Sequence, residues 1–101
     1  MIKIKAKKLS SWIEKSEGLL GAKKPSPIFF KTHFGIHTFF MKFPIDVVIL
    51  DSKGRVVAMK ESLYPNRLFI WNPYYSGVLE LPQGAVKKLK ITKNSIIQIT
   101  P

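Results

Sequence analysis

The sequence predicts a single α+β domain, residues 1–101, with a mostly antiparallel, strongly curved, barrel-like sheet. About six or seven short strands and one or two short helices are expected. Two observations lead to this fold class. Short apolar or alternating segments recur along the chain and are separated by turns rich in proline and glycine. The chain has 101 residues, of which 46% are hydrophobic, which suits one buried core but not two domains.

The central element of this prediction is the densest apolar run in the sequence, residues 38–51. Its three consecutive β-branched residues, Val-Val-Ile, favour a strand. The Asp-Ser-Lys-Gly sequence at residues 51–54 has the pattern of a type I turn followed by a residue with positive φ. We therefore expect a hairpin formed by Ile45–Leu50 and residues 55–60, with Ser-Lys at its tip.

The flanking segments supply the remaining elements. Residues 2–6 alternate isoleucine or alanine with lysine, which is typical of a half-buried strand with a basic outer face. Ser-Trp-Ile-Glu at residues 11–14 matches a capping box, so a short helix is expected over residues 12–19. Farther along we expect a strand from residue 28, a short apolar run at 68–71, a strand at 78–81, helical turns within 84–89 and a closing strand at 96–99.

Basic residues dominate the charge of the chain. There are 17 lysines and arginines against 6 acidic residues, a net charge of +11, and all but two of the basic residues are lysine. Lysines supply solubility and a diffuse positive field, whereas arginine matches phosphate geometry more closely. A solvated lysine surface is one explanation, and binding of a nucleic acid or another polyanion is the other. The second explanation predicts a binding face made of Lys3, Lys5, Lys7, Lys87, Lys88, Lys90 and Lys93.

Several classes of site are excluded by composition and spacing. The sequence has no cysteine, which excludes disulfides, thiolate metal sites and cysteine nucleophiles. His33 and His37 are separated by a segment that contains Gly35, which argues against a helix holding both on one metal. There is neither a Gly-x-Ser-x-Gly elbow nor a Gly-rich phosphate loop. We therefore expect no metal and no cofactor.

The sequence also bears on location. No apolar segment approaches the roughly 20 residues of a membrane helix, and none forms the apolar region of about 7–15 residues that a signal peptide needs. A cytoplasmic protein with no membrane partner is expected.

Two carboxylates interrupt apolar, strand-like segments. Asp46 follows Pro44 in the central run, and Glu80 lies within Val-Leu-Glu-Leu. A carboxylate in such a segment must be paired, hydrogen-bonded or exposed to solvent. Asp46 either accepts backbone amides near Pro44 or belongs to a site with Lys42 or His37. Glu80 either forms an ion pair, faces solvent, or acts with a second carboxylate as an acid–base pair.

Five segments of the chain follow a recognisable order. They are Gly-Leu-Leu at 18–20, His-Thr-Phe-Phe-Met-Lys-Phe-Pro-Ile-Asp at 37–46, Asp-Ser-Lys-Gly-Arg-Val-Val at 51–57, Pro65, and Leu-Glu-Leu-Pro-Gln-Gly at 79–84. Together they resemble domain-of-unknown-function family 192, although Phe40 replaces a usual tryptophan and Asn94-Ser95 a usual Gly-Asp. The resemblance implies a single α+β domain with a barrel-like sheet and no established activity. The family motif marks as candidate site positions Met41, Lys42, Pro44, Asp46 and Glu80.

Three functions are compatible with these features. The first is a small, non-enzymatic binding domain with a pocket near residues 38–46 and Glu80. Its candidate ligand-binding residues are His37, Thr38, Met41, Lys42, Asp46 and Glu80. The second is a non-specific nucleic-acid or polyanion binder that uses the lysine surface. The third is a small hydrolase-like enzyme that uses Asp46 with His37 or Glu80.

Overall fold

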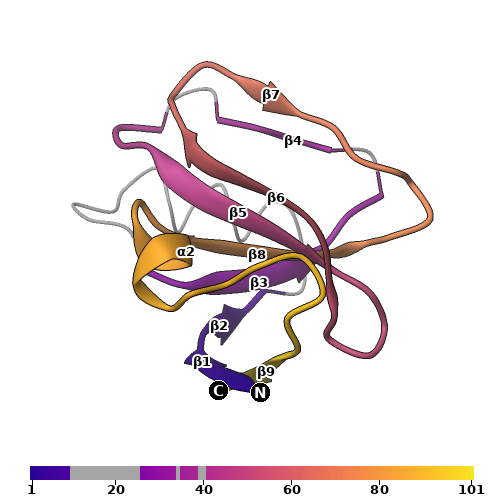
Figure 1. The fold of residues 1–101 in the computed structure, drawn as a ribbon. Coiled ribbons are helices and arrows are strands. Elements are labelled where there is room, and N and C mark those ends of the chain that lie inside the picture. The colour runs from indigo at the N-terminus through magenta and orange to yellow at the C-terminus, as the bar shows by residue number, and fades with distance from the viewer. Residues whose placement is uncertain (10–25, 34, 39–40) are drawn as a thin grey trace.

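The computed structural model describes residues 1–9, 26–33, 35–38 and 41–101. Within these residues the chain forms nine strands and one short helix (Figure 1). In chain order they are β1 (Ile2–Lys5), β2 (Lys7–Lys8), β3 (Ile28–Lys31), β4 (Ile36–His37), β5 (Ile45–Leu50), β6 (Val56–Leu63), β7 (Leu68–Phe69), β8 (Gly77–Pro82), α2 (Ala85–Lys88) and β9 (Ile97–Thr100).

Five of these strands form the central sheet, in the order β2-β3-β8-β5-β6. β2 runs parallel to β3, whereas β3–β8, β8–β5 and β5–β6 are antiparallel pairs. All six residues of β5 are buried, as expected of a strand covered on both faces. The β-branched run of the sequence therefore packs on both sides of the sheet.

Each face of the central sheet packs against different elements. On one face, Val47 and Val78 contact the apolar cluster that contains Ile36 of β4 and Trp71, just beyond β7. We call this the β4–β7 face. On the other, Val48 packs in the cluster formed with β1, β9 and α2, and we call this the α2 face. β4 and β7 form an antiparallel pair, and β1 and β9 form a parallel pair.

The predicted hairpin is confirmed. β5 and β6 are antiparallel neighbours, and β6 extends beyond the expected end at residue 60. In the turn, the N–H of Gly54 donates to the carbonyl of Asp51 at 3.1 Å, and Gly54 has a φ of 83°. A Cβ on Gly54 would lie 2.5 Å from the carbonyl oxygen of Ile97. Both the positive φ and this close approach require glycine.

Most of the other expected strands are also present. β1 buries Ile4 and exposes Lys3 and Lys5, as its alternation predicts. β3, β8 and β9 fall where strands are expected, β7 lies in the apolar run at 68–71, and α2 lies within the predicted helical turns at 84–89. Among the described residues no helix is long and apolar enough to cross a membrane.

The predicted fold class is wrong. The described residues are mostly strands with a single four-residue helix, and their mixed parallel and antiparallel sheets do not close into a strongly curved barrel. The physical reason is that local alternation marks a strand but not its partner. Both parallel pairs, β1–β9 and β2–β3, join segments that are far apart in the chain. The helix predicted over residues 12–19 lies outside the described residues.

Candidate functional site

The two predicted carboxylates lie on opposite faces of the central sheet. In the β5–β8 register, Glu80 is opposite Val47 and Asp46 is opposite Leu81. Successive side chains of a strand point to opposite faces. Glu80 therefore points to the β4–β7 face and Asp46 to the α2 face. The structure does not bring these two residues into one pocket.

Asp46 is a fully buried hydrogen-bond acceptor. Its Oδ1 accepts the N–H of Ser62 at 2.9 Å, and its Oδ2 accepts the N–H groups of Gly84 at 3.1 Å and Val86 at 3.0 Å. These donors belong to the end of β6 and to the start of α2, so the carboxylate ties both elements to β5. Backbone amides satisfy Asp46, as one alternative predicts, although the donors are far from Pro44 in sequence.

Three of the other predicted ligand-binding residues, Glu80, Met41 and His37, lie on the β4–β7 side. Glu80 is buried in β8 and faces Val47 across the strand pair. Met41 is part of the apolar cluster on this face. His37 is half-buried in β4, and Lys42 is exposed. In the part of the chain that the structure describes, no group of three or more histidine, aspartate or glutamate side chains is placed to hold a metal ion.

Thr38 holds the loop between β6 and β7. Its hydroxyl donates to the carbonyl of Tyr64 at 2.6 Å and accepts the N–H of Arg67 at 2.9 Å. Its own N–H donates to the Arg67 carbonyl at 2.9 Å, and its carbonyl accepts the N–H of Asn66 at 3.1 Å. The residue is completely buried, so its hydroxyl is engaged within the protein and is not presented to a ligand.

A cleft of about 860 Å³ lies at the end of the central sheet, where β5 enters its turn. Its lining includes the row in which Lys31 of β3, Gly77 of β8 and Leu50 of β5 are neighbours. A Cβ on Gly77 would lie 2.9 Å from the Leu50 carbonyl oxygen and 3.4 Å from the ring of Phe29. A side chain at position 77 would therefore collide with the backbone of β5, which favours glycine in the cleft lining.

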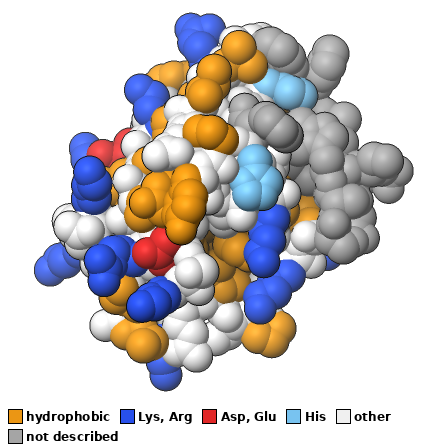
Figure 2. All heavy atoms as spheres, turned by 90° about the vertical axis from the view of Figure 1, so that its right-hand side faces the viewer, with side chains coloured by type: hydrophobic (Ala, Val, Ile, Leu, Met, Phe, Trp, Pro, Cys, Tyr) orange, Lys and Arg blue, Asp and Glu red, His pale blue; other side chains and the backbone are white. Residues whose placement is uncertain are grey.

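The walls of the cleft are cationic. Lys8 of β2 and Lys31 of β3 lie on one side of β8, and Lys53 and Arg55 of the β5–β6 turn lie on the other. With Asp51, these cations give the lining a net charge of +3. Figure 2 shows this side of the molecule, with basic side chains flanking apolar ones and few acidic ones. An anion in the cleft would therefore meet positive charge from two directions.

The one carboxylate in this lining, Asp51, is held by its own turn. Its Oδ1 accepts the N–H of Arg55 at 2.9 Å and that of Lys53 at 2.8 Å. The N–H of Arg55 is the main cause that keeps the pKa of Asp51 below its usual value. The N–H of Lys53 and the charges of both basic side chains act in the same direction, while burial opposes them. Asp51 is therefore ionised at neutral pH and partly offsets the cationic walls.

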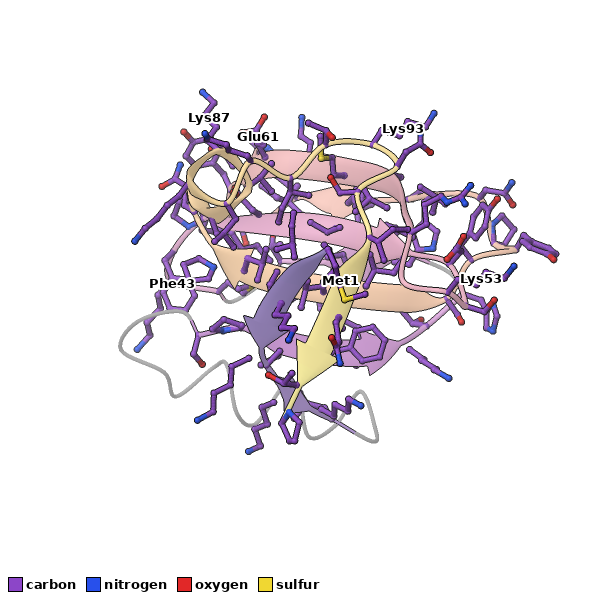
Figure 3. All side chains as sticks on the ribbon, turned by 60° about the horizontal axis from the view of Figure 1, so that its bottom comes forward. Met1, Phe43, Lys53, Glu61, Lys87 and Lys93 are labelled. Carbon is purple, nitrogen blue, oxygen red and sulfur yellow. The ribbon has the colours of Figure 1, made fainter. Side chains whose placement is uncertain are left out.

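The lysines predicted from sequence as a binding face are not the cations that line the cleft. The seven lysines named as a binding face are all exposed, but none of them lines the cleft. In Figure 3, Lys53 projects at the right-hand end of the molecule, whereas Lys87 projects from α2 at the upper left. Lys31 and Lys53 come together because β3 and β5 lie on either side of β8. No local sequence pattern reports that strand order.

Comparisons with known proteins place the chain in a family. The model of domain-of-unknown-function family 192, described as "Uncharacterized ACR", matches residues 3–99. A UPF0127 protein of Thermococcus kodakarensis is 34% identical over 71 residues, which cover 70% of this chain and 45% of that relative. A UPF0127 protein of Pyrococcus horikoshii is 34% identical over 87 residues, which cover 79% of this chain and 74% of the relative. The chain thus spans less than half the length of the first of these relatives.

Two crystal structures share the fold. A protein of unknown function from Novosphingobium aromaticivorans superposes with a TM-score of 0.72 at 16% identity, covering 91% of this chain and 70% of that one. A candidate transcription regulator from Sinorhizobium meliloti superposes with a TM-score of 0.68 at 19% identity, covering 91% and 76%. At these identities the likeness concerns the fold alone. Because the family model spans nearly the whole chain, this protein belongs to domain-of-unknown-function family 192, whose activity is uncharacterised.

Proposed function

We propose that this protein is a nucleic-acid-binding domain that holds phosphate groups in the cleft between β3 and the β5–β6 turn. The observation that carries the proposal is the placement of four cations around a cleft that aromatic side chains also line. Lysine and arginine form charge-assisted hydrogen bonds with phosphate, and release of counterions adds to the affinity. The net charge of +11 extends the attractive field beyond the cleft and favours fast association.

Two other functions predicted from the sequence have weaker support. A ligand pocket shared by Asp46 and Glu80 conflicts with their positions on opposite faces of the sheet. An acid–base pair of these carboxylates would need both at one reacting atom. Both oxygens of Asp46 also accept backbone N–H groups already. Binding in the cationic cleft is therefore the function that the geometry supports best.

Fluorescence polarisation of a short, labelled oligothymidylate, titrated at salt concentrations from about 50 to about 200 mM, tests this proposal. The double variant Lys31→Ala/Lys53→Ala removes one cation from each wall of the cleft. We expect it to bind about tenfold more weakly than the wild type. Each phosphate contact on a single strand contributes about 0.7 to the slope of log affinity against log salt, so the slope should become shallower by about 1.4.

The matched control is Lys87→Ala/Lys93→Ala, which removes the same charge from two exposed lysines outside the cleft. Screening of these more remote charges should limit its loss of affinity to about threefold or less. Equal or greater loss in the control would move the binding face to the lysines predicted from sequence. Absence of oligonucleotide binding by the wild type at the lowest salt would overturn the proposal. Circular dichroism melts of each variant check that the fold is retained.

A further inference from the structure

We infer that the nucleic acid is single-stranded and that the ring of Tyr74 stacks on one of its bases. This inference rests on the proposed function and specifies the ligand of the same cleft. Tyr74 lines the cleft and is 82% exposed, whereas Trp71, three positions earlier, is 7% exposed. A large aromatic ring left in solvent beside phosphate-binding cations is the arrangement that single-strand binders use for base stacking.

The loop that carries Tyr74, between β7 and β8, is held in place by hydrogen bonds. The side-chain Oδ1 of Asn72 accepts the N–H of Tyr74 at 3.0 Å, and the carbonyl of Asn72 accepts the N–H of Tyr75 at 3.0 Å. The indole N–H of Trp71 donates to the Tyr75 carbonyl at 2.7 Å. Because Trp71 is buried, it anchors the loop to the core. The exposed ring is thus supported by an ordered backbone, which reduces the entropy cost of stacking.

The ring of Tyr75 is the described aromatic neighbour of Tyr74. The centroids of Tyr74 and Tyr75 are 5.1 Å apart, and their planes meet at 85°, a T-shaped contact. Such a contact engages an edge of one ring and a face of the other. With 82% of Tyr74 exposed, its ring still presents open surface to a base. Tyr75 is half-buried and acts as the support.

The combination of a free aromatic surface with nearby cations favours one form of nucleic acid. In a duplex the bases are stacked on one another and their faces are not available. In a single strand the bases can be splayed out, and every base has a π-face that an aromatic ring can stack on. The cations of the cleft would hold the backbone while Tyr74 takes a base. The expected binding is therefore tolerant of base sequence.

Three variants and three probes test this inference by fluorescence polarisation and competition. The probes are an oligothymidylate, an abasic oligonucleotide of the same length and a duplex of the same length. Tyr74→Ala removes the ring, and Tyr74→Phe keeps it. Tyr64→Ala is the matched control, because Tyr64 is also exposed, at 54%, and its contact with Thr38 uses only its backbone carbonyl.

We expect Tyr74→Ala to bind the oligothymidylate about 5- to 150-fold more weakly, the range measured for loss of one base–aromatic stack. Its affinity for the abasic strand should stay within about twofold, since the phosphate contacts are unchanged. Tyr74→Phe and Tyr64→Ala should bind like the wild type, which should itself prefer the oligothymidylate to both other probes.

Unchanged binding of the oligothymidylate by Tyr74→Ala would overturn the stacking. Equal affinity of the wild type for the duplex and the single strand would overturn the choice of ligand. In both cases a loss of binding in Lys31→Ala/Lys53→Ala would still support the proposed function. Absence of binding to all three probes at low salt would overturn the inference and the proposed function together.

Discussion

β5 has an aspartate at each end, and the two carboxylates have different partners. Asp46, the second residue of the strand, accepts three backbone N–H groups from β6 and from the start of α2. Asp51, which follows the last residue, accepts two N–H groups from its own turn. Asp46 is fully buried, whereas the hydrogen bonds of Asp51 are exposed. One carboxylate joins distant segments of the chain, and the other shapes a local turn beside the cleft.

The difference shows why a carboxylate in an apolar strand is weak support for an active site. Asp46 stands out in the sequence as the more conspicuous residue, because it interrupts the central apolar run. Its burial is explained by backbone donors that the fold brings to it, since each of its oxygens accepts at least one of them. Asp51 looks like an ordinary turn residue, yet it belongs to the cleft that carries the proposed function.

The largest effect is expected at Asp46. Asp46→Ala leaves the backbone N–H groups of Ser62, Gly84 and Val86 without their acceptor in a buried setting. We expect the free energy of unfolding to fall by about 3–5 kcal/mol, measured by urea denaturation followed by circular dichroism. Asp51→Ala is the control and should lose far less, since water can reach the groups that it frees. Similar losses of unfolding free energy in the two variants would contradict the view that the buried Asp46 contributes more to stability than the exposed Asp51.

The second prediction compares Gly54, in the turn that follows β5, with Gly84, whose N–H donates to Asp46. Gly54 and Gly84 both have positive φ, at 83° and 89°. A Cβ on Gly54 would meet the Ile97 carbonyl oxygen at 2.5 Å, whereas a Cβ on Gly84 would have no atom within 4 Å. Gly84→Ala should therefore cost only the conformational term of about 1–2 kcal/mol.

Gly54→Ala has the same conformational cost and also brings its Cβ against the Ile97 carbonyl oxygen. We therefore expect its free energy of unfolding to fall by about 2–4 kcal/mol. Urea denaturation of the two variants under identical conditions measures the difference. If Gly84→Ala proved the more destabilising of the two, the packing of β9 against the turn would not be what restricts position 54.

Features with a local cause could be predicted from the sequence. The hairpin followed from the β-branched run and from the Asp-Ser-Lys-Gly turn, because both act within a few residues. The exposure of Lys3 and Lys5 followed from strict alternation. The order of the motif segments identified the family correctly.

Features that depend on strand order could not be predicted in this way. The donors to Asp46 at positions 84 and 86 are 38 and 40 residues away along the chain. Lys31 and Lys53 share a cleft only because β8 lies between β3 and β5. β1 and β9, at opposite ends of the described chain, form a parallel pair, and no turn motif signals such a pair. Local pattern thus specified the elements, and long-range pairing determined the site.

The smallest change in stability is expected when acid protonates the carboxylate of Asp51. Its folded-state pKa lies below the unfolded value of 3.8, chiefly because the Arg55 N–H stabilises the ionised carboxylate. The ionised group therefore stabilises the folded protein, and this contribution is fully present above the unfolded pKa. It is lost as the pH falls through the folded-state pKa. Asp51→Asn removes the contribution at every pH.

Urea denaturation at a series of pH values compares Asp51→Asn with the wild type. The difference in their free energies of unfolding should be constant between about pH 7 and pH 5 and should shrink below the unfolded pKa. Ser52→Ala, a neutral change in the same turn, should give a difference that does not vary with pH. A pH-independent difference for Asp51→Asn would mean that its hydrogen bonds hold the turn equally well without the charge. The carboxylate would then matter in the cleft only through its repulsion of an anionic ligand.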